Sequence, residues 1–343
     1  MKVLVPEHIT GTNLSKIKAI SSRIEISKLR IDQNNKPTFR LINYFKRGNS
    51  LVKISIDGED IDKADRDVEV FLCSWNINSD ILDRIVSSQS GLKWIHFTSS
   101  GVDRFITQKL IDSDIVLTSS KGVHSKRVAE FVFAMILCMS KKIPTHLKLQ
   151  EKKRWESIPS DELKGKTIGI LGYGHIGHEI AKKAPAFEMS VLAMRKNNNY
   201  RNAVLPVTFT SNIKDLLIES DYLIICAPLT RETRGLISES ELSSMKKNAY
   251  IINVSRGEII NEEALIKALN KNWIAGACLD VCIREPLPPN SPLYSLPNVL
   301  ITNHSAYLSP NSHREVFNLF LENLRRYIAG EGLLNVVNRE LCY

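Results

Sequence analysis

The chain has 343 residues, with 46 Lys and Arg against 37 Asp and Glu, so its formal net charge is +9 with neutral histidines. Hydrophobic residues make up 43% and charged residues 24%, which excludes a disordered chain, a collagen-like repeat and a disulfide scaffold. A chain of this length can form two domains with separate cores. The basic residues are spread along the chain without a block of about five or six like charges, so we do not expect nucleic acid as a partner.

The sequence does not predict a membrane-bound or disulfide-linked protein. Its longest nearly apolar run, residues 128–139, contains Glu130 and is shorter than the roughly 20 residues of a membrane helix. The start, MKVLVPEH, lacks the apolar core and cleavage site of a secretory signal, so we expect a cytoplasmic protein without a membrane partner. The six cysteines form no C-x-x-C motif, which argues against a zinc knuckle.

Short β-rich runs alternate with amphipathic ones in the first third of the chain, as in a parallel α/β sheet. These runs are KVLV, RIEISKL, EVFLCSW, LKWIHFT and IVLTSS. Between the second and third lies a polar segment, residues 32–67, which we interpret as a hairpin or a surface insertion. Its acidic residues do not fit a calcium loop, because a loop begun at Asp57 has Asp62 at the turn glycine and Val68 at the bidentate Glu.

A helix is expected from Lys121 to a point before Pro144, with apolar residues at helical spacing from Val128 to Met139. A place in the core explains this apolar face, and a contact between two subunits explains it equally well. A second series of strands and helices begins at LKGKTIGILGYGHIG and continues through DYLIICAP, AYIINVSRG, IAGACLDV and NVLITNH. An amphipathic helix over residues 312–329 follows, and such a helix can cross back to a first domain.

The run TIGILGYGHIG places Gly172, Gly174 and Gly177 between a predicted strand and a predicted helix. This pattern is typical of a dinucleotide site, because glycines let the backbone approach the pyrophosphate and the helix N-terminus offers N–H donors. At the end of the next strand, where a carboxylate would bind the ribose of NAD, stand Arg195 and Lys196. Arg195 can bind a 2′-phosphate, so the sequence favours NADP, with NAD possible; the alternative is a solvated surface arginine.

Several further segments follow one another along the chain. They are SSGVD, GVHSKRVAE, APLTRETRGLI, NVSRGE, LDVCIREPLP and ITNHSA. With these segments, nearly the whole chain resembles the D-isomer-specific 2-hydroxyacid dehydrogenase family, which includes glyoxylate/hydroxypyruvate reductases and phosphoglycerate dehydrogenases. The resemblance implies that Arg256, Glu285 and His304 are catalytic. Their chemistry agrees, because a guanidinium can hold a 2-oxo acid by two hydrogen bonds and a histidine paired with a carboxylate can transfer a proton.

The resemblance also implies further contacts. Ser100 and Gly101 would hold the substrate carboxylate through their backbone amides, together with Arg256. The remaining expected cofactor contacts come from segments that follow predicted strands, and they are His175, Ile176, Ala227, Pro228, Val254, Ser255 and Asp280, of which Asp280 would bind the nicotinamide carboxamide. No metal site is expected, since His175 and His178 have no evident third ligand.

The sequence departs from the family pattern at four positions. Arg195 replaces the usual acidic residue, and Asn303 stands where proline commonly precedes the catalytic histidine, which predicts a less rigid loop. Glu188 occupies a common glycine position, and Pro185 is expected to kink or end the helix that follows the glycine motif.

We therefore expect two doubly wound parallel-sheet domains, with a Rossmann NAD(P)-binding domain (residues 121–307) inserted into a flavodoxin-like substrate domain (residues 1–120 and 308–343). The expected enzyme is a homodimeric oxidoreductase that interconverts a small 2-oxo acid and its D-2-hydroxy acid, with NADPH-linked reduction of glyoxylate or hydroxypyruvate favoured. Alternatives are an NAD-dependent phosphoglycerate or other D-2-hydroxyacid dehydrogenase and, less favoured, a dinucleotide-sensing corepressor.

Overall fold

The computed structural model describes residues 1–31, 37–47, 50–60, 68–195, 205–339 and 341. The chain forms two compact units, Met1–Val123 with Pro310–Tyr343, and His124–Ser309. The predicted boundaries at 120/121 and 307/308 therefore lie two or three residues before the observed divisions. Among the described residues, no helix is long and apolar enough to cross a membrane.

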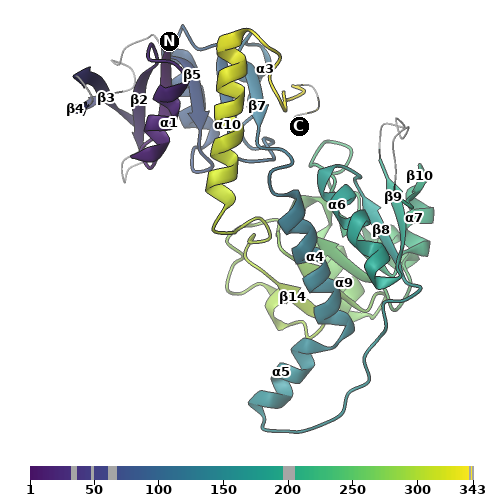
Figure 1. Ribbon diagram of the computed structural model, residues 1–343. Helices are drawn as coiled ribbons and strands as arrows, with labels where there is room; N and C mark the ends of the chain where they lie inside the picture. Colours follow the sequence, from purple (N-terminus) through teal and green to yellow (C-terminus); the bar gives the residue numbers. More distant parts are fainter. Residues whose placement is uncertain (32–36, 48–49, 61–67, 196–204, 340, 342–343) are drawn as a thin grey trace. The chain divides into compact units, whose positions relative to one another are not determined.

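The first unit is built on a sheet whose strands run in the order β4-β3-β2-β1-β5-β6-β7 (Figure 1). The strands β2, β1, β5, β6 and β7 are parallel, in the 2-1-3-4-5 order of flavodoxin-like folds. The strand bounds are β1 Lys2–Pro6, β2 Glu25–Ile31, β3 Pro37–Arg47, β4 Ser50–Asp60, β5 Val68–Cys73, β6 Trp94–Phe97 and β7 Val116–Ser119.

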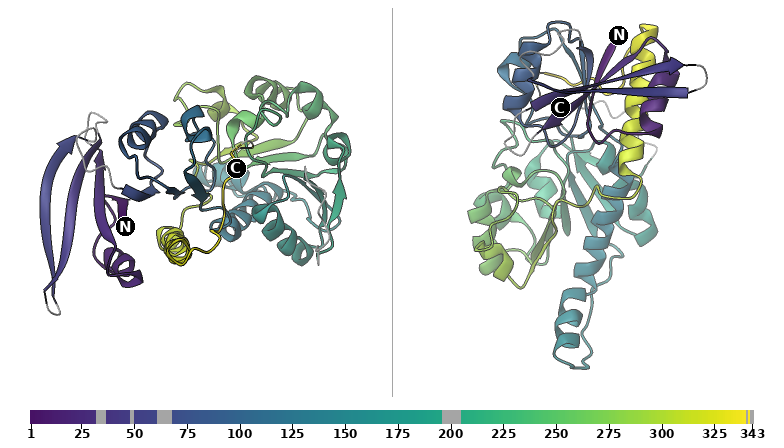
Figure 2. Two further views of the ribbon diagram at one scale, coloured as in Figure 1. Left: turned by 90° about the horizontal axis from the view of Figure 1, so that it is seen from above. Right: turned by 90° about the vertical axis from the view of Figure 1, so that its left-hand side faces the viewer.

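The polar segment 32–67 contributes an antiparallel hairpin. Strand β3 pairs antiparallel with β2 and with β4, so the sheet is mixed at this edge, where Figure 2 shows the pair as long dark strands. The hairpin alternative of the sequence interpretation is confirmed for the described residues. Residues 61–67, which contain most of the rejected calcium loop, lie outside the described residues.

The C-terminal helix packs in the core of the first unit. Phe320 of this helix stacks on the ring of Trp94 in β6, with 5.6 Å between ring centroids, and Leu324 is fully buried in the same cluster. Because Val3 and Val5 of β1 complete this cluster, the last helix covers one face of the sheet that the first strand begins. The helices of the unit are α1 Thr12–Ile20, α2 Ser79–Ser88, α3 Gln108–Ile111 and α10 Ser312–Ala329.

The second unit is built on a fully parallel sheet in the order β10-β9-β8-β11-β12-β13-β14. This is the strand order of dinucleotide-binding folds, in which the chain turns from one half of the sheet to the other between the first and fourth strands, here β8 and β11. The strand bounds are β8 Thr167–Leu171, β9 Ser190–Met194, β10 Thr208–Thr210, β11 Tyr222–Ile225, β12 Tyr250–Asn253, β13 Gly276–Leu279 and β14 Val299–Ile301.

Helices cover this sheet because both faces of its strands are apolar. The helix expected from Lys121 begins at Ser125, since residues 121–124 form a turn, and it ends at Ser140. Its apolar face lies in the core with Ile168 and Ile170 of β8. The helix bounds are α4 Ser125–Ser140, α5 Ile143–Glu151, α6 His175–Lys183, α7 Ile213–Glu219, α8 Glu239–Ser244 and α9 Glu262–Asn270, with the short 3-10 helices η1 Ala184–Phe187, η2 Gly257–Ile259 and η3 Pro292–Ser295.

The helix after the glycine motif ends as Pro185 predicts. Helix α6 stops at Lys183 and the chain continues as the 3-10 helix η1, which contains Pro185. The chain then turns at Glu188, whose φ of 53° and ψ of 34° lie in the left-handed region that favours glycine. Glu188 thus stands at a position whose backbone conformation favours glycine.

Candidate active site

The predicted site residues of the second unit lie at one edge of its sheet. All strands of this sheet are parallel, so their carboxyl ends meet at the same edge, where ligands bind in folds of this class. The residues found directly after strands at this edge are Gly172 and Gly174 (β8), Arg195 (β9), Ala227 and Pro228 (β11), Val254, Ser255 and Arg256 (β12), Asp280 (β13) and His304 (β14).

The glycine turn has the geometry that a dinucleotide needs. Gly172 has a φ of +97°, and a Cβ there would lie 2.4 Å from the backbone nitrogen of Ala227, so only glycine fits. Gly177 packs α6 on β8, because its Cβ would lie 3.0 Å from Cγ2 of Ile170. Gly174, the N-cap of α6, has open space beside it, so a phosphate can approach the N–H groups at the start of the helix.

The residues around the glycine turn join neighbouring segments at this edge of the sheet. His175 and Ile176 form the first turn of α6, and the Ser255 hydroxyl donates to the Ala227 carbonyl, which ties the segments after β11 and β12 together. His178 lies with its Nδ1 3.3 Å from the Tyr173 hydroxyl. Arg195 is exposed at the end of β9, while the neighbouring Lys196 lies outside the described residues.

The side chains of Glu285 and His304 are joined by a hydrogen bond. The Nδ1 atom of the His304 imidazole lies 2.8 Å from Oε2 of Glu285, and both side chains are 40% exposed. The second carboxylate oxygen, Oε1, accepts the backbone N–H of Cys282 at 3.1 Å. Because Nδ1 is occupied by Glu285, the ring presents Nε2 to a substrate.

The contacts of Glu285 shift the pKa of its carboxyl in opposite directions. Burial alone would raise the pKa of this carboxyl, but the hydrogen bond and charge of His304, the Cys282 N–H and the charge of Arg256 together lower it below its ordinary value. The carboxylate is therefore ionised throughout the neutral range.

Arg256 is held close to the segment that carries Glu285. Its Nη1 donates to the Ser255 carbonyl at 2.8 Å. The next residue, Gly257, packs its backbone on that segment, because a Cβ at Gly257 would lie 2.1 Å from the carbonyl carbon of Cys282 and 2.3 Å from the nitrogen of Ile283. The glycine thus lets the arginine segment and the glutamate segment approach each other.

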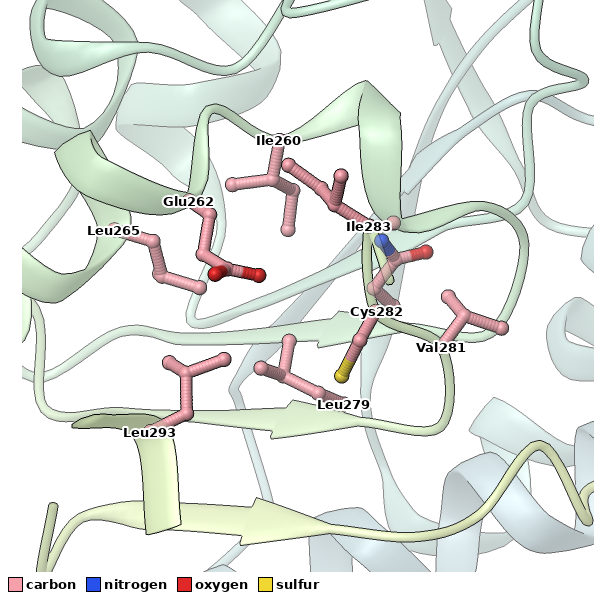
Figure 3. Close-up of a pocket in the computed structure, with 10 residues that line it drawn as sticks. Ile260, Glu262, Leu265, Leu279, Val281, Cys282, Ile283 and Leu293 are labelled. Carbon is pink, nitrogen blue, oxygen red and sulfur yellow. The ribbon is translucent and has the colours of Figure 1, made fainter. Parts of the chain in front are cut away.

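A pocket lies beneath the same segment (Figure 3). The Glu262 carboxylate and the Cys282 thiol point into it, between the side chains of Leu265, Leu279 and Leu293. Burial, followed by the charge of Glu262, raises the pKa of the Cys282 thiol to about 11, and burial also raises the pKa of Glu262. Cys282 is therefore protonated at neutral pH and is not an activated nucleophile.

Tyr307, which contacts His304, was not identified from the sequence, and neither were the residues that contact Tyr307 in turn. The ring of Tyr307 meets the His304 ring edge to face, with 5.9 Å between centroids, and lies 5.4 Å from the ring of His124. The Arg127 guanidinium donates to Nδ1 of His124 at 2.7 Å. Tyr307 follows His304 by three residues, and its aromatic ring was the available signal. His124 lies in the segment GVHSKRVAE, but nothing in that segment predicted that its ring would contact Tyr307.

The predicted substrate residues Ser100 and Gly101 belong to the first unit. They follow β6 at the carboxyl edge of its sheet, and the Ser100 hydroxyl donates to the Ser120 carbonyl at 3.1 Å. In the same loop, the buried hydroxyl oxygens of Thr98 and Ser99 have no hydrogen-bond partner among the described residues. That these residues face Arg256 stays a prediction, since they belong to the other unit.

Known proteins are similar to this chain in sequence and in fold. The model of the D-isomer specific 2-hydroxyacid dehydrogenase NAD binding domain matches residues 133–306. A glyoxylate reductase of Thermofilum pendens is 35% identical over 284 residues, which cover 81% of this chain and 83% of the relative. A D-3-phosphoglycerate dehydrogenase of Methanocaldococcus jannaschii is 30% identical over 277 residues, which cover 80% of this chain and 52% of the relative.

A solved structure extends the likeness to the whole chain. The D-isomer specific 2-hydroxyacid dehydrogenase of Xanthobacter autotrophicus Py2, in complex with NADPH and MES, superimposes with a TM-score of 0.79 and 27% identity, covering 99% of both chains. The second unit is thus a nicotinamide dinucleotide-binding domain. The chain belongs to the D-isomer specific 2-hydroxyacid dehydrogenase family and is an oxidoreductase that acts on the CH–OH group of donors.

Proposed function

We propose that this protein reduces a small 2-oxo acid, of the glyoxylate or hydroxypyruvate type, to the corresponding D-2-hydroxy acid with NADPH. The observation that carries the proposal is the pair formed by His304 and Glu285, next to Arg256, at the ligand-binding edge of the dinucleotide domain. The glyoxylate reductase of Thermofilum pendens supports the choice of substrate.

Each of the three side chains has a distinct role in this reaction. The planar Arg256 guanidinium binds the substrate carboxylate by two hydrogen bonds and polarises the adjacent carbonyl. The His304 imidazolium gives a proton from Nε2 to the carbonyl oxygen as it gains negative charge. Glu285 orients the ring through Nδ1 and stabilises its charged form. When bound, the nicotinamide dinucleotide supplies the hydride.

The residues around the glycine turn suit the dinucleotide. Gly174 leaves space for the pyrophosphate, and the N–H groups of His175 and Ile176 at the start of α6 would bind it. The exposed guanidinium of Arg195 would bind a 2′-phosphate, which favours NADPH over NADH. The NADPH-bound Xanthobacter autotrophicus enzyme supports this preference.

In this proposal, the two units bind different molecules. The second unit binds the cofactor, and the first is the substrate-binding domain, in which the backbone amides of Ser100 and Gly101 provide a second contact to the carboxylate. The buried hydroxyls of Thr98 and Ser99, which have no hydrogen-bond partner in the described part of the chain, mark the same loop as a place where further hydrogen bonds can form.

The proposal includes a homodimer in the cytoplasm. None of the side chains of helix α5 is fully buried, and Figure 1 shows it extending away from the sheet of the second unit. Leu147 on this helix is 55% exposed, and Trp155 in the following segment is fully exposed. A second copy of the chain would cover these apolar side chains. The five described cysteines are free thiols, as is usual in a reducing compartment.

Product analysis tests the proposal. The purified protein is incubated with hydroxypyruvate and either NADPH or NADH, and glycerate is separated by chiral chromatography. We expect D-glycerate, formed faster with NADPH, and we expect Arg195→Ala to raise KM for NADPH about tenfold while leaving that for NADH unchanged. L-glycerate, or no product from any small 2-oxo acid despite cofactor binding, would contradict it and favour the dinucleotide-sensing alternative.

A further inference from the structure

His304 has a backbone conformation that needs support from its surroundings. Its φ of 53° lies in the left-handed region, where a side chain meets the following carbonyl oxygen. Residues other than glycine keep such a conformation when the neighbouring structure holds them in it. Asn303, the preceding residue, lacks the ring by which a proline would stiffen the chain. The support must therefore come from elsewhere.

Asp280 provides this support from the end of the neighbouring strand. Its carbonyl accepts the N–H of His304 at 2.8 Å. Its carboxylate accepts the Thr302 hydroxyl at 2.7 Å and the Ser305 N–H at 2.9 Å through Oδ1, and the Ala306 N–H at 3.1 Å through Oδ2. Asp280 is only 2% exposed, and a buried carboxylate is stable when donors satisfy it in this way. These hydrogen bonds bracket His304 on both sides.

Asn253 holds Arg256 in a similar way. It is fully buried at the end of β12, and its side-chain amide donates to the Arg256 carbonyl at 2.8 Å while its Oδ1 accepts the Ser255 N–H at 3.1 Å. The backbone carbonyl of Asn253 accepts the N–H of Asp280 at 3.0 Å. The two buried polar residues are thus joined directly, across adjacent parallel strands.

We propose that Asn253 and Asp280 form a buried polar bridge that sets Arg256 and His304 relative to each other. Each is thus a positioning residue, Asp280 in addition to the nicotinamide contact expected from the family resemblance. This inference rests on the proposed function and extends it beyond the residues that touch substrate. Asn253 acts through Arg256 and therefore on substrate binding. Asp280 acts through the backbone of His304 and therefore on proton transfer. Small displacements of such groups cost large factors in rate.

Two variants test the contacts of Asp280 and the contacts of Asn253 separately. Thr302→Val removes one donor to Asp280 with little change in shape, and we expect kcat for hydroxypyruvate to fall about tenfold with KM changed less than about twofold. Asn253→Asp removes the amide that donates to Arg256 while keeping an oxygen for Ser255, and we expect KM to rise about tenfold, more than kcat falls. NADPH binding, followed by its fluorescence, should be unchanged in Thr302→Val.

Asn212→Ala is the matched control. Asn212 caps α7 in the same unit through the N–H of Lys214, so its loss perturbs stability without touching the bridge. Hydrogen exchange gives a readout that does not depend on turnover. We expect faster exchange of the amides of residues 304–306 in Thr302→Val than in wild type or Asn212→Ala.

The outcomes are distinguishable. The bridge is contradicted if Thr302→Val has the same kcat as wild type and the same exchange rates at residues 304–306. It is also contradicted if Asn212→Ala changes kcat and KM in the same way as the two bridge variants. If the wild-type protein turns over no 2-oxo acid, the proposed function fails, and the exchange measurement alone still decides whether the bridge holds the His304 loop.

Discussion

Glu285 is subject to two opposing influences on its pKa. Burial favours its neutral form, while the hydrogen bond and charge of His304 favour its ionised form and prevail. A carboxyl whose pKa is lower in the folded protein stabilises the fold above its unfolded pKa, and this stabilisation is lost as the pH falls through the folded value. The ionised Glu285 carboxylate therefore contributes least to the free energy of unfolding under acid conditions, below the ordinary carboxyl pKa of 4.5.

The variant His304→Ala tests this balance. Because burial remains and the hydrogen bond is lost, we expect the pKa of Glu285 to rise in the variant. We also expect the free energies of unfolding of the variant and the wild type to become more alike as the pH falls below about 4.5. Carbon NMR of the side-chain carboxyl measures the titration. Glu241, whose pKa is also lowered but by contacts within the cap of α8, is the internal control. An unchanged Glu285 titration would show that His304 does not determine its ionisation.

Gly257 is a second residue on which the site depends. In Gly257→Ala the added Cβ meets the backbone of Cys282 and Ile283, so the segments that carry Arg256 and Glu285 must separate. We expect a loss of about 1–3 kcal/mol in the free energy of unfolding and about a 10- to 100-fold fall in kcat/KM. Gly332→Ala is the matched control, since nothing lies within 4 Å of its added Cβ. Thermal unfolding and steady-state kinetics measure both effects, and equal behaviour of the two variants would contradict the contact.

At the scale of the elements, the end of η1 has backbone strain at a defined residue. Glu188 ends η1 in the left-handed region, and its carboxylate pairs with Lys164 at 2.8 Å, with both side chains more than 60% exposed. An exposed ion pair contributes little, whereas a side chain in this backbone conformation costs about 1 kcal/mol.

The variant Glu188→Gly should therefore be more stable than wild type, by about 0.5–1 kcal/mol. Glu188→Gln removes the ion pair and keeps the strain, so it separates the two contributions and should be no more stable than wild type. Denaturant unfolding of the three proteins measures the order. A glycine variant no more stable than the glutamine variant would argue against strain at this turn.

The elements differed in how far the sequence could predict them. The strands of the second sheet read clearly as apolar runs because helices bury both of their faces. The hairpin β3–β4 was left open between two interpretations, since its polar composition resembles that of a surface loop. The start of α4 was wrong by four residues, because the turn at 121–124 carries no strong breaker besides Gly122.

Contacts between strand ends were beyond sequence reasoning. The motif segments located Arg256, Glu285 and His304, yet the hydrogen bonds between Asp280 and the His304 loop join residues more than 20 positions apart in the chain. They exist because the register of β12, β13 and β14 brings the strand ends together. No local pattern encodes such a register.

At the scale of the whole molecule, the exposed apolar surface differs from the one the sequence suggested. The run from Val128 to Met139 was equally compatible with a core and with a subunit contact, and the structure places it in the core of the second unit. The unburied helix is instead α5, with Leu147 and the nearby Trp155 exposed. In the dimer that we propose, α5 would therefore provide the contact.

The variant Leu147→Glu should therefore shift the protein from dimer to monomer, because a charge in the contact loses the buried apolar area and is poorly solvated there. Ile218→Glu is the matched control, since Ile218 is 52% exposed on α7 of the same unit. Light scattering after size exclusion gives the mass of each. A monomeric wild type, or an equal effect of both substitutions, would contradict a dimer through α5.

The central claim is that His304, paired with Glu285, delivers the proton in a 2-oxo acid reduction. The most direct measurement is NADPH oxidation, followed by its absorbance, for wild type and His304→Ala with glyoxylate and hydroxypyruvate. We predict turnover by the wild type and about a 10²- to 10⁴-fold lower kcat in the variant, with NADPH binding retained. Turnover of the variant within a few-fold of wild type would contradict this assignment.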